Sequence, residues 1–324
     1  TKPKAQVYNN YSPHPLFLTG RDMNGSDWFL LPRAGAQTLG WAEDWATGGS
    51  WGLGTPMTEC TTFYAALVEC SVRTRGYPAG FYVGSNCGYS AQKMFSCVSQ
   101  GITILHLYDW GPIDSWAEGS NSWSEYKDQY LSVAQGTHAL GPADEIIGTG
   151  KREARRTAVL YNRSHEIVSG NRVGLNRDWM WTFLGLRNSG IPVDVVIEED
   201  LTEAELNRYD VLFVGGLNLE RRHLKALRAW VERGGVLIGS SGAALSDVYG
   251  DRMTETTELF GATQRLATAE DKASREKVRF QGTDDFPDVE LAAAAAENQR
   301  YILTPTTGKA AAKYDGGEVA AVVN

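Results

Sequence analysis

The sequence has no apolar run that approaches the roughly 18 residues that a helix needs to cross a bilayer. Its first residues, Thr1 to Gln6, also lack the apolar core of a secretory signal peptide. Basic residues are in deficit, because 31 Lys and Arg face 39 Asp and Glu and leave a net charge of −8. These deficits argue against a membrane or a nucleic acid as the partner of this chain.

Cysteine is scarce and confined to one short stretch, at Cys60, Cys70, Cys87 and Cys97. No C-x-x-C pair occurs among them, which disfavours a zinc site. Three disulfide pairings are possible, but two of these cysteines fall on expected helices among apolar neighbours. Buried thiols are therefore favoured over disulfides.

Patterns that bind a metal or a phosphate are also missing. His14 and His106 have no second ligand at metal spacing, so each is expected to be a structural histidine. The turn Gly239-Ser240-Ser241-Gly242 lacks the Lys and Ser/Thr that complete a P-loop. The sequence therefore predicts no metal and no cofactor.

What the chain does contain suits two soluble domains. Its 324 residues are 42% hydrophobic and 22% charged, enough to build sizeable cores. Residues 1–150 hold seven of the ten tryptophans, and the charged helices lie mostly beyond them. The join is a glycine turn followed by the basic run Lys151 to Arg156, which suits a linker. We predict domains at 1–148 and 156–324.

The second domain shows short apolar runs that alternate with amphipathic segments. This alternation is typical of a flavodoxin-like, doubly wound parallel sheet. Gly190 is expected to stop one helix and Thr202 to cap another. Strands are expected at 157–161, 193–197, 211–214 and 235–239, with helices at 178–188, 202–206 and 219–233. Residues 292–296, an alanine run, are interpreted as helix rather than disorder.

The first domain is expected to be part of a (β/α) barrel. Each expected strand ends in polar and aromatic residues, as at the active face of such a barrel. A closed barrel needs eight strands, so the four found here would be its last four, and the others would precede residue 1. We also interpret 319–323 as an interrupted strand, so both ends are expected to be cut. The strands are expected at 5–9, 38–42, 80–83 and 102–108, and the helices at 28–34, 61–73 and 91–100.

The triplet Glu43-Asp44-Trp45 is the first candidate site, at the end of the second of these strands. One carboxyl group could protonate a leaving oxygen or attack an anomeric carbon, while an indole stacks on the apolar face of a sugar. The alternative is an acidic loop whose carboxylates cap a helix or lie in solvent. The neighbouring Trp41 and Trp51 weigh toward the sugar site.

A second candidate is the segment Tyr108 to Pro112. Asp109 could hold a sugar hydroxyl and Trp110 could form the floor of the pocket, unless the segment is an aromatic plug or a plain loop. Asn9 could also bind hydroxyl groups, although Asn pairs are common in turns.

Taken together, these motifs and their order resemble the β-galactosidases of glycoside hydrolase family 42. The resemblance implies that 1–145 matches the second half of the barrel and that 156–324 matches a trimerisation-like domain related to class I glutamine amidotransferases. It also implies a carbohydrate substrate, a homo-oligomer that could be a trimer, an acid/base Glu after the fourth barrel strand and a nucleophilic Glu after the seventh.

The chain departs from this pattern in two places. The fourth strand is absent, and Phe81 to Asn86, at the presumed seventh strand, holds no carboxylate. The turn Gly215 to Asn218 holds no nucleophilic cysteine, which disfavours amidotransferase chemistry and makes that domain structural. Two hypotheses stay open: a glycoside hydrolase acting on a β-galactoside-like sugar, and a non-catalytic carbohydrate-binding or assembly protein derived from one.

Overall fold

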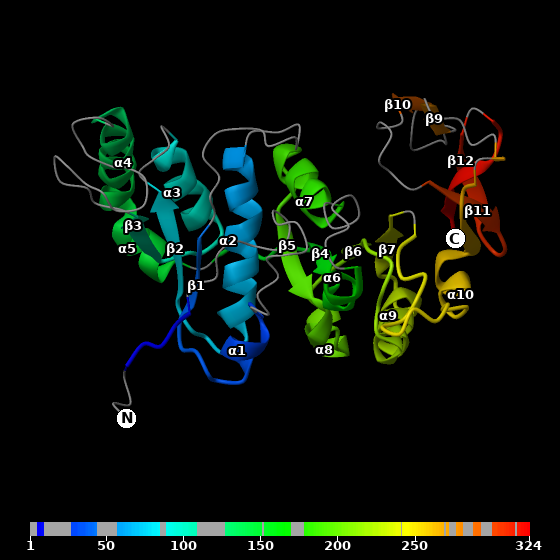
Figure 1. Cartoon of the computed structure of the whole chain (residues 1–324), viewed down its shortest axis with the longest axis horizontal. Helices are drawn as coiled ribbons and strands as arrows, with labels where there is room; N and C mark the ends of the chain where they lie inside the picture. The colour runs from blue at the N-terminus through cyan, green and yellow to red at the C-terminus, as the bar shows by residue number, and fades with distance from the viewer. Residues whose placement is uncertain are drawn as a thin grey trace. The chain divides into compact units, whose positions relative to one another are not determined.

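The computed structural model shows a mixed α/β protein (Figure 1). Contacts divide the chain into two compact units, Thr1–Ala154 and Arg155–Asn324. Within the part of the chain that is described, no helix is long and apolar enough to cross a membrane. The structure describes residues 5–9, 27–43, 57–84, 89–108, 127–150, 152–169, 178–240, 242–268, 270–271, 277–280, 288–292, 300–314 and 316–324.

The first unit contains a three-stranded parallel sheet, which is consistent with part of a glycosidase-like barrel. Its strands lie in the order β1-β2-β3. One helix connects β1 to β2 and another connects β2 to β3, as in β/α units. The strands are β1 (Gly40–Glu43), β2 (Ala79–Gly84) and β3 (Ile104–Tyr108), and the helices are α1 (Leu30–Arg33), α2 (Met57–Arg73), α3 (Ser90–Ser99), α4 (Lys127–Leu140) and α5 (Asp144–Thr149), with a 3₁₀ turn η1 (Gly141–Ala143).

Helix α2 is buried on almost every side because it is apolar around most of its circumference. Phe63 and Leu67 of α2 join Phe81 of β2 in the core of this unit. Three cysteines, Cys60, Cys70 and Cys97, are buried thiols, as predicted, and Cys87 lies outside the described residues.

The predicted strand at 5–9 is wrong. These residues are exposed and form no β-ladder. Val7 instead accepts a hydrogen bond from Thr38 N (2.9 Å), and its own N–H donates to Thr38 Oγ1 (2.9 Å). The side chain of Thr38 thus takes the place of the backbone group that would continue a β-ladder. Residues 5–9 also bury no apolar face, so nothing offsets the loss of conformational entropy on ordering a strand here. The described parallel strands of the first unit therefore number three.

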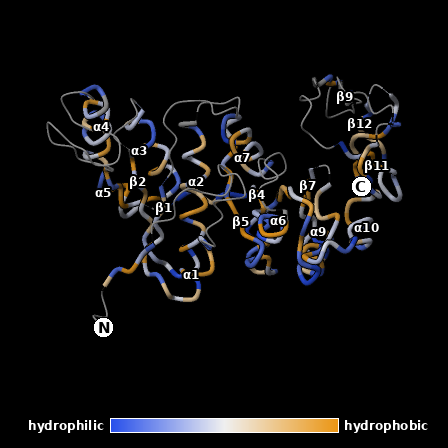
Figure 2. The backbone as a smooth tube through the Cα atoms, viewed as in Figure 1, coloured by the Kyte–Doolittle hydropathy of each residue, from blue (hydrophilic) through white to orange (hydrophobic). Residues whose placement is uncertain are grey.

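The second unit begins with a four-stranded parallel sheet in the order β5-β4-β6-β7. This is the order of the first four strands of flavodoxin-like sheets. Strand β5 is buried throughout, and apart from Asp194 its residues are hydrophobic (Figure 2). The strands are β4 (Thr157–Tyr161), β5 (Val193–Ile197), β6 (Val211–Val214) and β7 (Val236–Gly239), and the helical segments are α6 (Arg163–Ser169), α7 (Asp178–Asn188), η2 (Glu198–Asp200), α8 (Glu203–Leu206), η3 (Arg221–His223) and α9 (Leu224–Glu232).

Local sequence signals set the ends of these helices. Thr202 Oγ1 accepts a hydrogen bond from Glu205 N (3.2 Å), so Thr202 caps α8 as predicted. Gly190 has a φ of +77° just after α7, a conformation that favours glycine and stops the helix. On the inner side of α9, Leu227 and Trp230 pack against Leu160 and Leu212 of the sheet.

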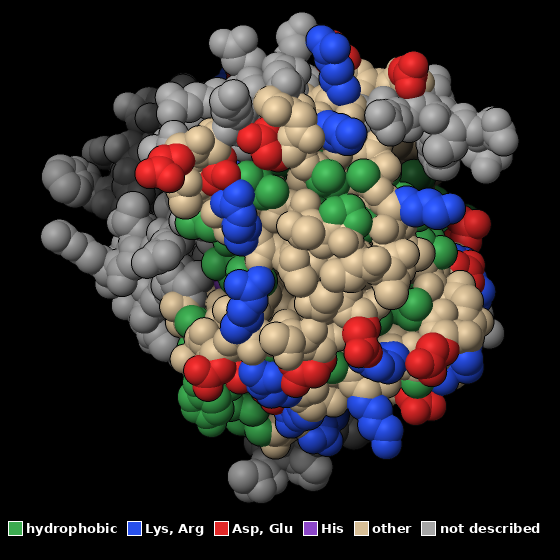
Figure 3. All heavy atoms as spheres, turned by 90° about the vertical axis from the view of Figure 1, so that its right-hand side faces the viewer, with side chains coloured by type: hydrophobic (Ala, Val, Ile, Leu, Met, Phe, Trp, Pro, Cys, Tyr) green, Lys and Arg blue, Asp and Glu red, His purple; other side chains and the backbone are tan. Residues whose placement is uncertain are grey.

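The doubly wound pattern does not continue to residue 324. After β7 and α10 (Thr256–Phe260), the chain forms a six-stranded antiparallel sheet in the order β10-β9-β12-β13-β11-β8. On the face that Figure 3 shows, basic side chains lie beside acidic ones. The strands are β8 (Ala262–Leu266), β9 (Lys277–Phe280), β10 (Val289–Ala292), β11 (Tyr301–Pro305), β12 (Lys309–Tyr314) and β13 (Val319–Val323).

Of the two predictions at this end, the alanine helix is wrong at Ala292 and the strand at 319–323 is confirmed. Ala292 ends strand β10 and pairs with Lys277, so pairing with β9 overrides the helix propensity of alanine; 293–296 lie outside the described residues. The segment 319–323 is strand β13, hydrogen-bonded on one side to β12 and on the other to β11.

Candidate functional site

A row of three polar side chains crosses the carboxyl ends of the first unit's parallel strands. Glu43 of β1 lies in register with Tyr82 of β2, which lies in register with His106 of β3. Side chains alternate between the two faces of a sheet, so residues in register share one face. The strands therefore bring a carboxyl group, a phenol and an imidazole together.

Trp41 forms the wall of this row. It lies in register with Gly80, where an added Cβ would come within 2.2 Å of the indole ring, so the missing side chain makes room for the indole. The indole centroid lies 5.0 Å from the ring of Tyr82, edge to face, and 5.7 Å from that of His106. The ring centroid of Tyr8 lies 5.0 Å from that of the Trp41 indole. Such aromatic pairs hold one another in fixed orientations.

The row is partly screened from solvent. Glu43 is 8% exposed, whereas His106 is exposed and Tyr82 is half-buried. Burial raises the pKa of Tyr82, and the charges of Tyr8 and Glu43 add to this effect. Glu43 thus lies close enough to Tyr82 to act on its ionisation, and a screened carboxyl group beside a phenol can donate or accept a proton.

The structure describes only part of the predicted site. Glu43 lies in the row, and Asn9 is exposed at the end of the segment 5–9. The other predicted residues, Asp44, Trp45, Asp109 and Trp110, lie outside the described residues. Their approach to Glu43 therefore stays a prediction.

Sequence reasoning missed Tyr82, and it assigned His106 a structural role, whereas the structure exposes His106 in the row. The alternation of side chains along a strand could have identified both Tyr82 and His106. Counting by twos along β2 and β3 places each on the face of Glu43, provided that the register between the strands is known. That register is set by tertiary pairing, which single strands do not reveal.

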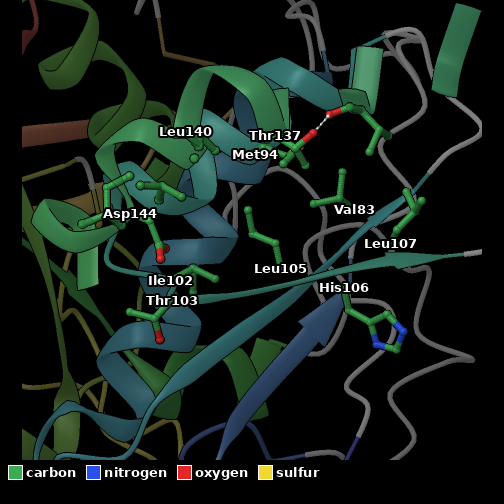
Figure 4. Close-up of a pocket in the computed structure, with 14 residues that line it drawn as sticks. Val83, Met94, Ile102, Thr103, Leu105, His106, Leu107, Thr137, Leu140 and Asp144 are labelled. Carbon is green, nitrogen blue, oxygen red and sulfur yellow. Dashed lines mark hydrogen bonds between the residues drawn. The ribbon is translucent and has the colours of Figure 1, made fainter. Parts of the chain in front are cut away.

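The opposite face of β3 borders an apolar cavity of about 360 Å³. Figure 4 shows Leu105 and Leu107 directed toward it, with Met94 and Leu140 across from them, while the His106 ring points away. This cavity presents few polar groups and lies on the helix side of the sheet, so it adds no chemistry to the row.

One cluster in the second unit has the composition of a metal site. Single ligand atoms of Glu198, Glu220 and His223 lie within 4.8 Å of one another. Glu198 already accepts hydrogen bonds from Ser164 N (2.8 Å), Ser164 Oγ (2.8 Å) and Glu220 N (2.6 Å). Arg222 Nε lies 3.3 Å from His223 Nε2. The Arg222 guanidinium would repel a cation, and the three donors already occupy the Glu198 oxygens. The cluster is therefore better explained as a set of hydrogen bonds that links neighbouring segments.

The similarity of this chain to known proteins lies in its fold. No protein-family model matches the chain, and no curated protein matches its sequence. Solved structures do match. Gan42B, a GH42 β-galactosidase from G. stearothermophilus, has a TM-score of 0.61 at 14% identity over 90% of this chain. A β-galactosidase from the psychrophilic Marinomonas ef1 has a TM-score of 0.63 at 12% identity over 89% of this chain.

This similarity places the chain among proteins with a glycoside-hydrolase fold. More specifically, the fold is GH42-like, since both neighbours cover about nine-tenths of the chain. The chain spans 48% of the length of each neighbour. At 12–14% identity the match establishes the fold alone.

Proposed function

We propose that this chain is part of a glycoside hydrolase that cleaves a β-galactoside-like or related sugar, with Glu43 as its catalytic carboxyl group. The observation that carries the proposal is the row itself. A screened carboxyl group lies beside Tyr82 and His106 at the carboxyl ends of parallel strands, where barrel enzymes hold their catalytic residues.

In this proposal Glu43 donates a proton to the glycosidic oxygen as its bond to the anomeric carbon breaks. Trp41 is buried and cannot itself stack on a sugar, so it serves to orient Tyr82 and His106. Tyr8, at 45% exposure, and the exposed His106 offer accessible ring surfaces. We assign substrate contacts also to Asn9, Trp45, Asp109 and Trp110.

A second carboxyl group completes the chemistry. Asp44 is the candidate that adjoins Glu43 in the sequence. A separation of roughly 5–5.5 Å between the two reacting carboxyl groups would give retention of configuration, and one of roughly 6.5–9.5 Å would give inversion.

The second candidate function is carbohydrate binding or assembly without catalysis. Gly84 ends β2, and Phe81 to Asn86 contains no carboxylate where the resemblance calls for a nucleophile. Under either function, we propose that the second unit supports a homo-oligomer, which light scattering of the full chain would measure.

The deciding experiment compares the full chain with its Glu43→Gln variant on a panel of nitrophenyl glycosides. Loss of a carboxyl group that transfers protons lowers kcat by about 10²–10⁴-fold. Glu145→Gln, an exposed change in α5, is the matched control and should leave kcat unchanged. Activity that survives in Glu43→Gln would move the catalysis elsewhere, and sugar binding with no turnover in the unmodified chain would favour the binding protein.

A further inference from the structure

The second unit has a cavity of its own at the carboxyl edge of its parallel sheet. The chain leaves β4 toward β5 on one side, and β6 lies on the other, so the order of strands reverses between β4 and β6. In open α/β sheets, ligands bind in the crevice at such a reversal. A cavity of about 100 Å³ lies beside this reversal, between the start of α7 and the ends of β6 and β7, with Val159 of β4 also in its lining.

The lining of this cavity combines an apolar wall with a few polar groups. Phe213 and Ile238 supply apolar surface from the strands. Asp178 and Trp179, in the first turn of α7, and Ser240, just after β7, supply the polar groups. A mostly apolar lining with a few fixed polar groups is typical of small-molecule sites.

Trp179 supplies the strongest evidence for a ligand. Its side chain is 1% exposed, and its indole N–H has no hydrogen-bond acceptor in the structure as described. The rings of Tyr161, at 4.6 Å, and His165, at 5.6 Å, fix the indole in place. A buried donor without a partner is costly and rare in folded proteins, so an acceptor from outside the chain is expected.

Gly215 lies against the edge of this indole. A Cβ added there would lie 3.1 Å from Trp179 Cδ1, 3.2 Å from its Nε1 and 3.4 Å from Asp178 Cβ. Because glycine has no side chain, residue 215 places no side-chain atom between the N–H group and Asp178. An alanine at this position would occupy it without removing any polar group.

The charge at the site selects the chemistry of the ligand. The Asp178 carboxyl group is largely buried, which raises its pKa. In its ionised form it would repel a carboxylate or phosphate, whereas a simple cation could not accept the hydrogen bond that Trp179 offers. A hydroxyl group satisfies both demands, since it accepts through its oxygen and donates through its hydrogen.

We propose that this cavity binds a small uncharged polyol, with one hydroxyl oxygen accepting from Trp179 Nε1 and another hydroxyl donating to the Asp178 carboxyl group. The carbon chain of the ligand would lie against Phe213 and Ile238. This site does not involve Glu43, so it stands or falls independently of the proposed hydrolase activity.

The test follows the indole N–H resonances of the ¹⁵N-labelled full chain during titration with glycerol and erythritol. The resonance that is missing from Trp179→Phe identifies Trp179, and it should shift with a saturable dependence on polyol. The affinity should fall at least fivefold in Trp179→Phe and in Gly215→Ala. Trp181→Phe, on the same helix at a residue with 36% exposure, is the matched control and should bind as the unmodified chain does.

Three results would overturn the proposal. The Trp179 resonance could fail to move with either polyol, or the Trp179→Phe variant could keep full affinity. The third result would be that acetate binds the site with higher affinity than glycerol. Thermal unfolding of each variant, compared with that of Trp181→Phe, separates loss of binding from loss of fold.

Discussion

His165 shows how one side chain can couple this fold to pH. The imidazole is fully buried, and its Nδ1 accepts a hydrogen bond from Leu217 N (3.2 Å) and lies 3.3 Å from Asn218 Oδ1. Burial lowers the pKa of His165 from its ordinary value of 6.5, so the folded state favours the neutral ring. The unfolded chain takes up the proton at a higher pH than the folded chain does.

We therefore expect the stability that His165 contributes to be complete above pH 6.5 and to fall as the pH drops below that value. His165→Asn keeps an acceptor near the position of Nδ1 but does not titrate. The variant should lose about 1–3 kcal/mol at neutral pH, because the ring packs on Trp179, and its stability should depend less on pH below 6.5. Urea unfolding from pH 5 to 8 measures this, and parallel pH profiles for the two proteins would refute it.

Gly80 is the residue on which the geometry of the row depends. An added Cβ would lie 2.2–2.3 Å from two indole carbons of Trp41, too close for any real contact. Gly80→Ala should therefore cost about 1–3 kcal/mol and displace the indole. Near-ultraviolet circular dichroism and denaturant unfolding would report the two effects.

Gly148→Ala provides the control for that substitution. It lies in α5 with nothing within 4 Å of an added Cβ, so it should be neutral or slightly stabilising. Equal losses in the two variants would show that Gly80 is not specifically required.

At the scale of elements, one carboxylate joins three segments of the parallel sheet. Glu198 follows β5 and accepts from both the backbone and the hydroxyl of Ser164, at the start of α6, and from the backbone of Glu220, before η3. The ends of β4, β5 and β6 are thus held at one point. Charge-assisted bonds of this kind are among the stronger ones in proteins.

We expect Glu198→Ala to destabilise the protein by about 3–5 kcal/mol, because it leaves buried donors without an acceptor. Glu203→Ala, at an exposed position on the next helix, should change stability by under about 0.5 kcal/mol. Chemical denaturation compares the two variants, and a loss in Glu198→Ala no larger than in Glu203→Ala would contradict the linking role.

The elements also show what the sequence could predict. Strands β4, β5 and β6 and helix α7 have the predicted bounds, because their signals are local: short apolar runs, a stop at Gly190 and a cap at Thr202. The antiparallel sheet escaped prediction because its strands pair over long distances and contain few large apolar residues, as in Lys309 to Tyr314. Of the site, Glu43 could be named from its neighbours, whereas Tyr82 and His106 required the register of three strands.

At the scale of the whole molecule, the chain consists of two compact units. The second unit has a core cluster that joins Leu160, Leu212 and Trp230. In the first unit, β1 and β3 are the edges of the described sheet, and edge strands invite pairing with other chains.

We expect residues 155–324, expressed alone, to unfold cooperatively and to resist limited proteolysis. Residues 1–154, expressed alone, should self-associate, because the edge strands β1 and β3 of the described sheet can pair with other copies. Circular dichroism, protease digestion and size-exclusion chromatography would compare the pieces with the full chain. A non-cooperative transition in 155–324 would show that this unit depends on the first.

The placement of β13 has a consequence for synthesis. This strand follows all its partners in the sequence, yet it lies between β12 and β11 in the sheet. Until residues 319–323 have been added, no strand links β11 to β12. Strand β11 can then pair only with β8, and β12 only with β9, so the sheet exists as separate fragments. The parallel sheet can form as it emerges, but the antiparallel sheet closes only once residues 319–323 have been made, so truncation before residue 319 would leave one edge of β11 and one edge of β12 unpaired.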